Sequence, residues 1–204
     1  LLSRGLGDVY KRQKQTSPQR GYIDADFPAP ALTTQYCYEL SQWLYEHFSK
    51  DQEVLMATIH GSYLYGTAHE NSDLDCYIVT LDGENTHTEY TTRNGYVIDI
   101  RRNDLHRYTE LLKIGAHQAV EAFNSPYAVW NTESIWFPYL KAHRTSFGAF
   151  AMKCLSASES FIASAQHNEE KQEKMLRHAQ RLEDGVLMAA EKDGYYNPVW
   201  KPLG

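Results

Sequence analysis

Two aspartates one residue apart, Asp73 and Asp75, stand at the start of an apolar run. If this run is a β-strand, alternate side chains share a face, so both carboxylates point the same way while Leu74 points into the core. Two carboxylates side by side repel each other and are costly to desolvate, and a divalent cation offsets both effects. Magnesium takes oxygen ligands, commonly one or two carboxylates together with phosphate oxygens and water. The pair therefore predicts a magnesium site.

A third carboxylate, Asp99, lies within a second run of strand type, residues 95–102. Alternation places Ile98 and Ile100 on one face of this run and Asp99 on the other. An ionisable side chain among β-branched residues is unusual on a strand with a buried face. If this strand pairs beside residues 74–80, Asp99 can complete a site of three carboxylates.

The pair Gly61-Ser62 follows an apolar run, and a spacer of ten residues separates Ser62 from Asp73. Glycine lets the backbone approach a ligand closely, and a turn opened by Ser62 directs its N–H groups outward, which favours an anion such as a triphosphate. Two metal ions about 3.5–4 Å apart can then stabilise the attacking and leaving oxygens of an in-line displacement at the α-phosphorus. These residue types at this spacing indicate chemistry at a nucleoside triphosphate.

The elements that must position these residues can be predicted from periodicity and turn signals. A helix is expected over residues 33–48, where apolar side chains recur at helical spacing after a threonine cap. A hairpin turn is expected at Arg93-Asn94-Gly95, because Asn and Gly tolerate positive φ. Strands are expected at residues 54–60, 74–80, 87–92 and 95–102.

The pattern becomes helical after Asp104 and breaks at Gly194 and Pro198. The helices are expected at about residues 104–114, 117–124, 134–143, 146–166 and 169–191. This order of elements predicts an α+β fold, in which a small mixed sheet flanked by helices is followed by a helical C-terminal half.

The chain of 204 residues suits one core domain with a helical extension. We expect a disordered or artefactual leader at residues 1–20, because residues 7–13 resemble translated adapter sequence. The catalytic core is expected at residues 21–130, and a helical C-terminal region at 131–204.

Gly61-Ser62, the spacer, Asp73-x-Asp75 and the later Asp99 together resemble the motif of the DNA polymerase β superfamily of nucleotidyltransferases. The longer form, Gly-Ser-x-x-Tyr-Gly and then Ser-Asp-x-Asp, resembles a group of predicted nucleotidyltransferases that is common in bacteriophages and bacteria. The resemblance covers about residues 54–190 and is strongest over 60–79. Two later segments, residues 117–126 and 174–185, resemble later helices of that group.

This resemblance implies a polymerase-β-like core that moves a nucleoside monophosphate from a nucleoside triphosphate to a hydroxyl and releases pyrophosphate. It implies that Asp73 and Asp75 bind two Mg²⁺ ions, with Mn²⁺ as an alternative. Asp99 would bind one of them and help to activate the attacking hydroxyl. Gly61 and Ser62 would hold the triphosphate.

Basic side chains in the C-terminal half are further candidates for contact with the nucleotide. Three share one face of the last expected helix, at positions i, i+4 and i+7: Lys174, His178 and Arg181. They either line the nucleotide or acceptor cleft or belong to a solvated face. Pairs at i, i+4 would support that solvated face: Glu170–Lys174 and Glu173–Arg177. Lys153, in the preceding helix, is a candidate for contact with phosphate.

The bulk composition excludes several classes of protein. Net charge is −6, so a nucleic-acid partner would need a local basic patch. No apolar run approaches the roughly 18–20 residues that span a bilayer, and no signal peptide is recognisable, so we expect a cytoplasmic protein without a membrane partner. The three cysteines are odd in number and far apart, which predicts reduced, buried thiols: Cys37, Cys76 and Cys154.

The acceptor cannot be read from the sequence, and an RNA end, a protein side chain and a small molecule all stay open. Two other functions also stay open. One is a non-catalytic regulatory module that retains a nucleotide site. The other is a nucleic-acid hydrolase with paired carboxylates, although a triphosphate cradle has no purpose in that chemistry.

Overall fold

The computed structural model describes residues 19–70, 72–167, 169, 172–188, 190–192 and 194–197. The expected leader, residues 1–20, therefore lies outside the described residues except for its last two, which begin the first strand. The division into a core at 21–130 and a helical region at 131–204 stays a prediction.

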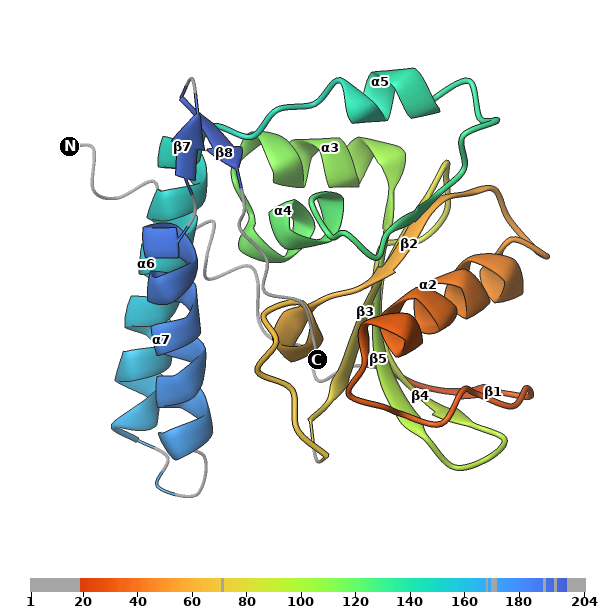
Figure 1. Ribbon diagram of the computed structural model, residues 1–204, viewed down its shortest axis with the longest axis horizontal. Coiled ribbons are helices and arrows are strands. Elements are labelled where there is room, and N and C mark those ends of the chain that lie inside the picture. Colours follow the sequence, from red (N-terminus) through yellow and green to blue (C-terminus); the bar gives the residue numbers. More distant parts are fainter. Residues whose placement is uncertain are drawn as a thin grey trace.

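A mixed sheet of six strands forms the centre of the fold, in the order β1-β4-β5-β3-β2-β6 (Figure 1). Its strands are β1 (Gln19–Ile23), β2 (Val54–Ile59), β3 (Leu74–Thr80), β4 (Thr86–Thr92), β5 (Val97–Asp104) and β6 (Val129–Trp130). The four strands expected from the sequence are all present. The sequence did not predict β1 and β6, which pair at the two edges of the sheet.

Strands β3 and β5 are parallel neighbours, although β4 lies between them in the sequence. The β4–β5 hairpin carries the chain past β5 and back, and its turn contains Gly95 at φ 86°. The turn chemistry of Asn94-Gly95 thus formed the expected hairpin. The sequence could place Asp99 in the site only if β5 paired beside β3, and the structure confirms that pairing.

Both faces of the sheet are covered, which explains why β2 and β3 read as nearly continuous apolar runs. One core cluster packs β-strand side chains such as Leu74 and Ile78 against helix α2 (Thr34–Phe48). The second cluster lies on the opposite face, where Tyr77 and Val79 meet the later helices. The side chain of Asp75 points to this second face, because it alternates with Leu74 and Cys76.

The later helices are α3 (Leu105–Lys113), α4 (His117–Phe123), α5 (Phe137–Lys141), α6 (Phe147–Ala165) and α7 (Gln172–Met188). The expected α+β class with a helical C-terminal part is confirmed. Helix α5 is shorter than the predicted 134–143. The N–H of Ser134 bonds the side chain of Asn131 instead, so a turn replaces the first helical residues.

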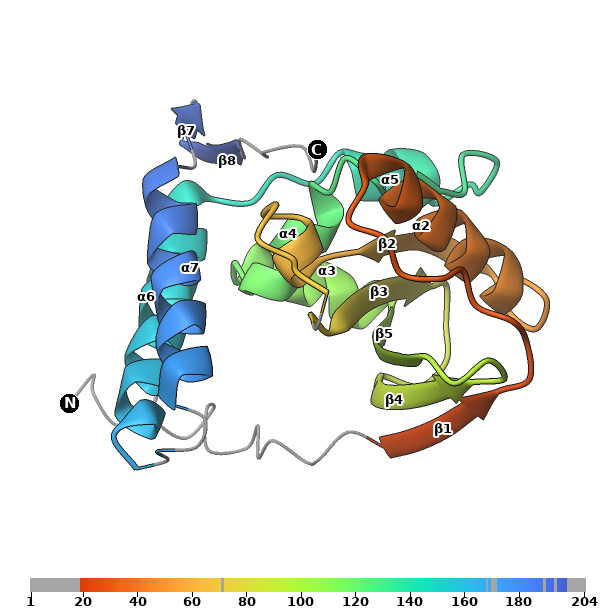
Figure 2. The same cartoon turned by 60° about the horizontal axis from the view of Figure 1, so that its bottom comes forward.

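Helices α6 and α7 lie side by side at one end of the molecule (Figures 1 and 2). The predicted end of α7 at residue 191 is wrong. The helix ends at Met188, and a small hairpin of β7 (Ala190–Lys192) and β8 (Tyr195–Asn197) follows. Gly194, at φ 80°, lies in the turn between these two strands. The sequence predicted that Gly194 interrupts the helical pattern, and the helix has already ended at Met188.

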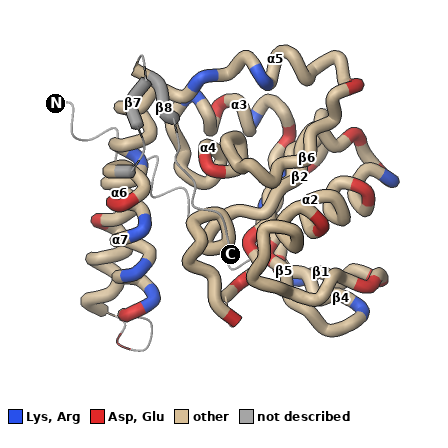
Figure 3. The backbone as a smooth tube through the Cα atoms, in the orientation of Figure 1, with Lys and Arg blue, Asp and Glu red and all other residues tan. Residues whose placement is uncertain are grey.

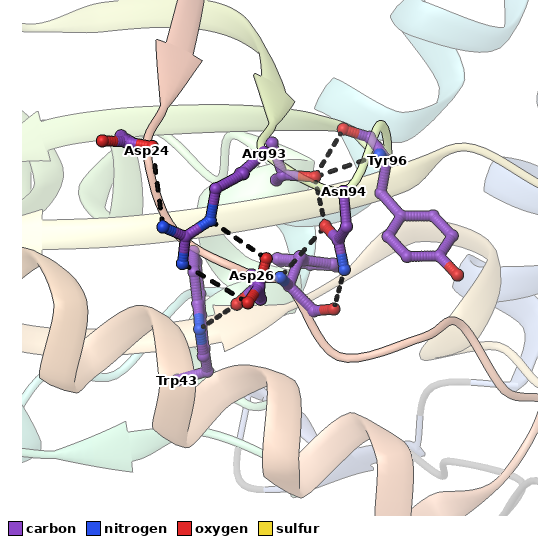
Figure 4. A network of polar contacts seen from close by, with 8 residues as sticks. Asp24, Asp26, Trp43, Arg93, Asn94 and Tyr96 are labelled. Carbon is purple, nitrogen blue, oxygen red and sulfur yellow. Dashed lines mark hydrogen bonds and ion pairs between the residues drawn. The ribbon is translucent and has the colours of Figure 1, made fainter.

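A network of polar contacts fixes the β4–β5 turn to the segment before α2 (Figure 4). The side chain of Asn94 accepts from Phe27 N at 3.1 Å and donates to Phe27 O at 2.8 Å. Arg93 donates two hydrogen bonds to Asp26, and Trp43 of α2 donates to the carbonyl of the same residue. This network holds the start of β5, and hence Asp99, against the body of the domain.

Two predictions from composition can be compared with the structure. All three cysteines are buried and free, as expected. Among the helices of the described segments, none combines the length and the apolar character that a membrane span requires.

Candidate active site

The loop after β2 places the Gly61-Ser62 pair directly beside Asp75. Gly61 adopts φ 70°, and residues Gly61–Tyr63 form one turn of 3₁₀ helix. A methyl group on Gly61 would overlap the carboxylate oxygen Oδ2 of Asp75. Both the left-handed backbone and the close approach therefore require glycine at this position. The preceding backbone N–H of His60 donates to the carbonyl of Asp75 at 2.9 Å, which fixes the loop to the start of β3.

Asp75 and Asp99 are register partners on the parallel strands β3 and β5. Neighbouring strands lie about 4.8 Å apart, so the two carboxylates lie side by side on one face of the sheet. Asp73 comes directly before β3, and its side chain is 64% exposed. The structure thus brings Asp75 and Asp99 together with Gly61 and leaves Asp73 at the rim.

A histidine that the sequence reasoning did not assign lies against this site. Nε2 of His87, on β4, is 2.5 Å from Oδ1 of Asp99. The alignment is not that of a hydrogen bond, and this carboxylate oxygen is buried without a hydrogen-bond partner among the described residues. The register of β4 and β5 places His87 on the same face of the sheet as Asp99. The sequence alone gives no sign that the two side chains meet.

Residues 42–121 match the sequence model of the family described as polymerase beta, nucleotidyltransferase. Residues 42–121 form a polymerase β-type nucleotidyltransferase domain. The match runs from the middle of α2 to α4 and includes the Gly-Ser loop and all three aspartates. Among curated proteins, none matches this sequence. The superfamily resemblance is confirmed, while the narrower resemblance to the group from bacteriophages and bacteria stays a prediction.

Helix α7 lies outside the matched residues, and it contributes a cation to the candidate site. Nζ of Lys174 donates to Oδ2 of Asp73 at 2.6 Å. Of the two expected helical pairs, Glu173–Arg177 forms at 2.7 Å, and Glu170 lies outside the described residues. Figure 3 shows the lysine and arginine positions that recur along α7. The choice between the two interpretations of the basic stripe stays a prediction, because Glu173–Arg177 is an exposed pair while Lys174 contacts Asp73.

The other two members of the stripe, His178 and Arg181, are half-buried. His178 stacks on Phe161 of α6, with ring centroids 5.4 Å apart. Burial lowers the pKa of His178 to about 4, and the charge of Arg181 acts the same way, so His178 is neutral at pH 7. The guanidinium carbon of Arg181 lies 5.3 Å from the ring centre of Tyr65, in the Gly-Ser loop. Lys153 lies half-buried on α6, the neighbouring helix.

The residues present fit a divalent cation in part. Asp75 and Asp99 offer oxygen donors of the kind that magnesium prefers, although Oδ1 of Asp99 lies against Nε2 of His87. Against this, the described residues contain no group of three or more acidic, histidine or cysteine side chains close enough to hold a metal. Asp73 is paired with Lys174 instead. The donor types therefore fit, and a site of three carboxylates would require Asp73 to separate from Lys174.

Burial raises the pKa of the Asp75 carboxyl from 3.8 to about 6, and the nearby carboxylates of Asp99 and Asp73 act the same way. The charges of Arg181 and Lys174 oppose this shift. A carboxyl whose pKa is raised by folding stabilises the fold fully below its unfolded pKa, and this contribution is lost as the pH rises through the folded pKa. In metal-free protein, the contribution of the Asp75 carboxyl to stability should therefore be lost between about pH 4 and pH 6.

The variant Asp75→Asn should lack this loss. In EDTA, its Tm should equal that of the wild type near pH 4 and exceed it at pH 7.5 by roughly 3–8 °C, since the shift corresponds to at most about 3 kcal/mol. Thermal melts at both pH values measure this difference. Equal Tm values at pH 7.5 would show that Asp75 is not destabilised by its surroundings.

Proposed function

We propose that this domain transfers a nucleoside monophosphate from a nucleoside triphosphate to a hydroxyl acceptor and releases pyrophosphate. One observation carries the proposal: Asp75 and Asp99 are in register on neighbouring strands, with Gly61 held against the Asp75 carboxylate. The family match supports it, because it covers all of these residues. A half-buried pair of carboxylates beside a glycine loop is suited to a triphosphate that arrives with its cations.

In this reaction the acceptor oxygen forms a bond to the α-phosphorus while the bond from that phosphorus to the bridging oxygen breaks. The acceptor hydroxyl loses its proton, and pyrophosphate leaves with the bridging oxygen. Asp73, Asp75 and Asp99 would hold two Mg²⁺ ions, or Mn²⁺ in their place. When bound, these ions supply charge neutralisation at the triphosphate and at the attacking and leaving oxygens.

The protein's own groups orient the substrate. The N–H groups of the loop at Gly61 and Ser62 would bind the triphosphate. Lys174 and Arg181 would add positive charge from α7, and Asp99 would accept or orient the proton of the acceptor hydroxyl.

Two further side chains, on α6 and α7, would also contact the nucleotide. His178, neutral at pH 7, would contribute a hydrogen bond rather than a charge. Lys153 would approach a phosphate from α6.

A second candidate, a non-catalytic nucleotide-binding regulatory module, is favoured by the contact between Lys174 and Asp73. As long as that contact persists, one of the three carboxylates is neutralised by a lysine. Such a protein would bind a nucleoside triphosphate and return it unchanged. The same experiment distinguishes the two functions.

Purified protein with Mg²⁺ and each α-labelled nucleoside triphosphate should be incubated with a crude extract that has been separated into RNA, protein and small-molecule fractions. Label is expected to enter one fraction, which identifies the acceptor class. A sample in EDTA and the variant Asp99→Asn serve as controls, and neither should transfer label. Nucleotide binding without transfer to any fraction would contradict the proposed transfer and favour the regulatory module.

A further inference from the structure

A buried carboxylate, Glu121 of α4, lies beneath the Gly-Ser loop and is only 1% exposed. The hydroxyl of Tyr65 donates to its Oε1 at 2.8 Å. Its other oxygen, Oε2, lies 4.0 Å from Nδ1 of His60, a buried nitrogen without a hydrogen-bond partner among the described residues. His60 and Tyr65 bracket the loop, so Glu121 lies near both of its ends and is hydrogen-bonded to one of them, Tyr65.

The ring of Tyr65 joins this loop to α7 as well. The guanidinium carbon of Arg181 lies 5.3 Å from the centre of the ring. A methyl group on Gly185, one turn further along α7, would stand 3.2 Å from the tyrosine oxygen, so a side chain there would press on Tyr65. Tyr65 therefore contacts α4 through its hydroxyl and α7 through its ring.

A buried carboxylate in an apolar helix is costly unless it is hydrogen-bonded or paired. Burial raises the pKa of Glu121, and the charge of Arg181 and the hydrogen bond from Tyr65 oppose that rise. Replacement of Glu121 by an apolar residue would remove this cost, but it would leave the hydroxyl of Tyr65 without this acceptor. The carboxylate is explained better by what it holds in place.

We propose that Tyr65 and Glu121 are positioning residues, which fix the loop of residues 61–66 relative to Asp75 and to Arg181. The inference rests on the proposed function, because it assigns the loop to the triphosphate. The loop begins at Gly61, whose approach to Asp75 leaves no room for a methyl group, so a small displacement changes where its N–H groups point. The hydrogen bond between Tyr65 and Glu121 prevents that displacement.

The test measures affinity for α,β-methylene analogues of the four nucleoside triphosphates, with Mg²⁺, by calorimetry at 20 °C. In Tyr65→Phe the loop loses its hydrogen bond to Glu121, so Kd for the preferred analogue should rise about 10-fold. In Glu121→Gln the amide oxygen still accepts from Tyr65, and Kd should stay within about threefold of the wild type.

The matched control is Ser158→Ala. Ser158 of α6 is buried and donates to Oε1 of Glu183 on α7 at 2.6 Å, so this variant also removes a bond from a hydroxyl to a carboxylate, but one away from the loop. Both variants should lower the Tm, and Ser158→Ala should leave Kd unchanged. The difference in Kd between Tyr65→Phe and Ser158→Ala separates an effect on the position of the loop from a general loss of stability.

Three outcomes can be distinguished. Weaker binding in Tyr65→Phe with normal binding in Glu121→Gln and Ser158→Ala supports the proposal. Unchanged Kd in Tyr65→Phe, while the wild type binds an analogue, overturns it and leaves the proposed function standing. Failure of the wild type to bind any of the four analogues overturns the proposed function, and this inference with it.

Discussion

The variant Asp75→Asn is expected to lower the rate of nucleotidyl transfer by about 10³-fold or more, because the charge that would hold the metal and align the triphosphate is removed. Asparagine keeps the size of the side chain and one of its oxygens, so the hydrogen-bonded start of β3 should stay intact. The rate is measured as label transferred to the acceptor fraction under single-turnover conditions.

Asp82→Asn is the control for this change. Asp82 is exposed and follows β3 at its opposite end, so removal of its charge should leave the rate unchanged. Circular dichroism of both variants checks that the fold is retained. A transfer rate for Asp75→Asn within about tenfold of the wild type would rule out a central role for this carboxylate.

The variant Gly61→Ala should lower transfer by about 100-fold or more. An L-residue at φ 70° costs about 1–2 kcal/mol, and the added methyl group would overlap the Asp75 carboxylate, so the loop and the carboxylate must move apart. A displacement of about 1 Å between substrate-positioning groups can cost about 100-fold in rate. Stability should fall as well, and a thermal melt measures that part.

Gly95→Ala separates the two effects of Gly61→Ala. Gly95 has φ 86°, but a methyl group there would meet nothing within 4 Å. The control should therefore share the backbone cost of Gly61→Ala, lower the Tm by a few degrees and keep its transfer activity. Equal activities in the two alanine variants would show that close approach at Gly61 does not matter.

Much of the sheet could be predicted because its signals are local. The apolar run of β3 and the Asn94-Gly95 turn each specify their element within a few residues. Alternation then placed Asp99 on the face opposite Ile98 and Ile100, both of which are buried. These local rules do not identify which strands pair. The position of β5 beside β3 could therefore be assumed from the sequence but not predicted.

The features that the sequence did not predict depend on distant contacts. Strand β1 is short and pairs in parallel with β4, more than sixty residues later in the chain. Lys174 was assigned to the nucleotide from its helical spacing, but that spacing does not reveal its partner, Asp73. Tyr65 was one of fifteen tyrosines, and only the fold shows that Glu121 lies beneath it.

The contact between Lys174 and Asp73 also bears on the order in which the site is assembled. It joins residues 101 positions apart, whereas α6 and α7 are neighbours in the sequence. Contacts at long sequence separation form late, because the intervening chain must first lose its freedom. During synthesis the strands with the aspartates leave the ribosome well before α7, and N-terminal units fold first. We therefore expect the sheet with Asp75 and Asp99 to form before α7 docks and Lys174 pairs with Asp73.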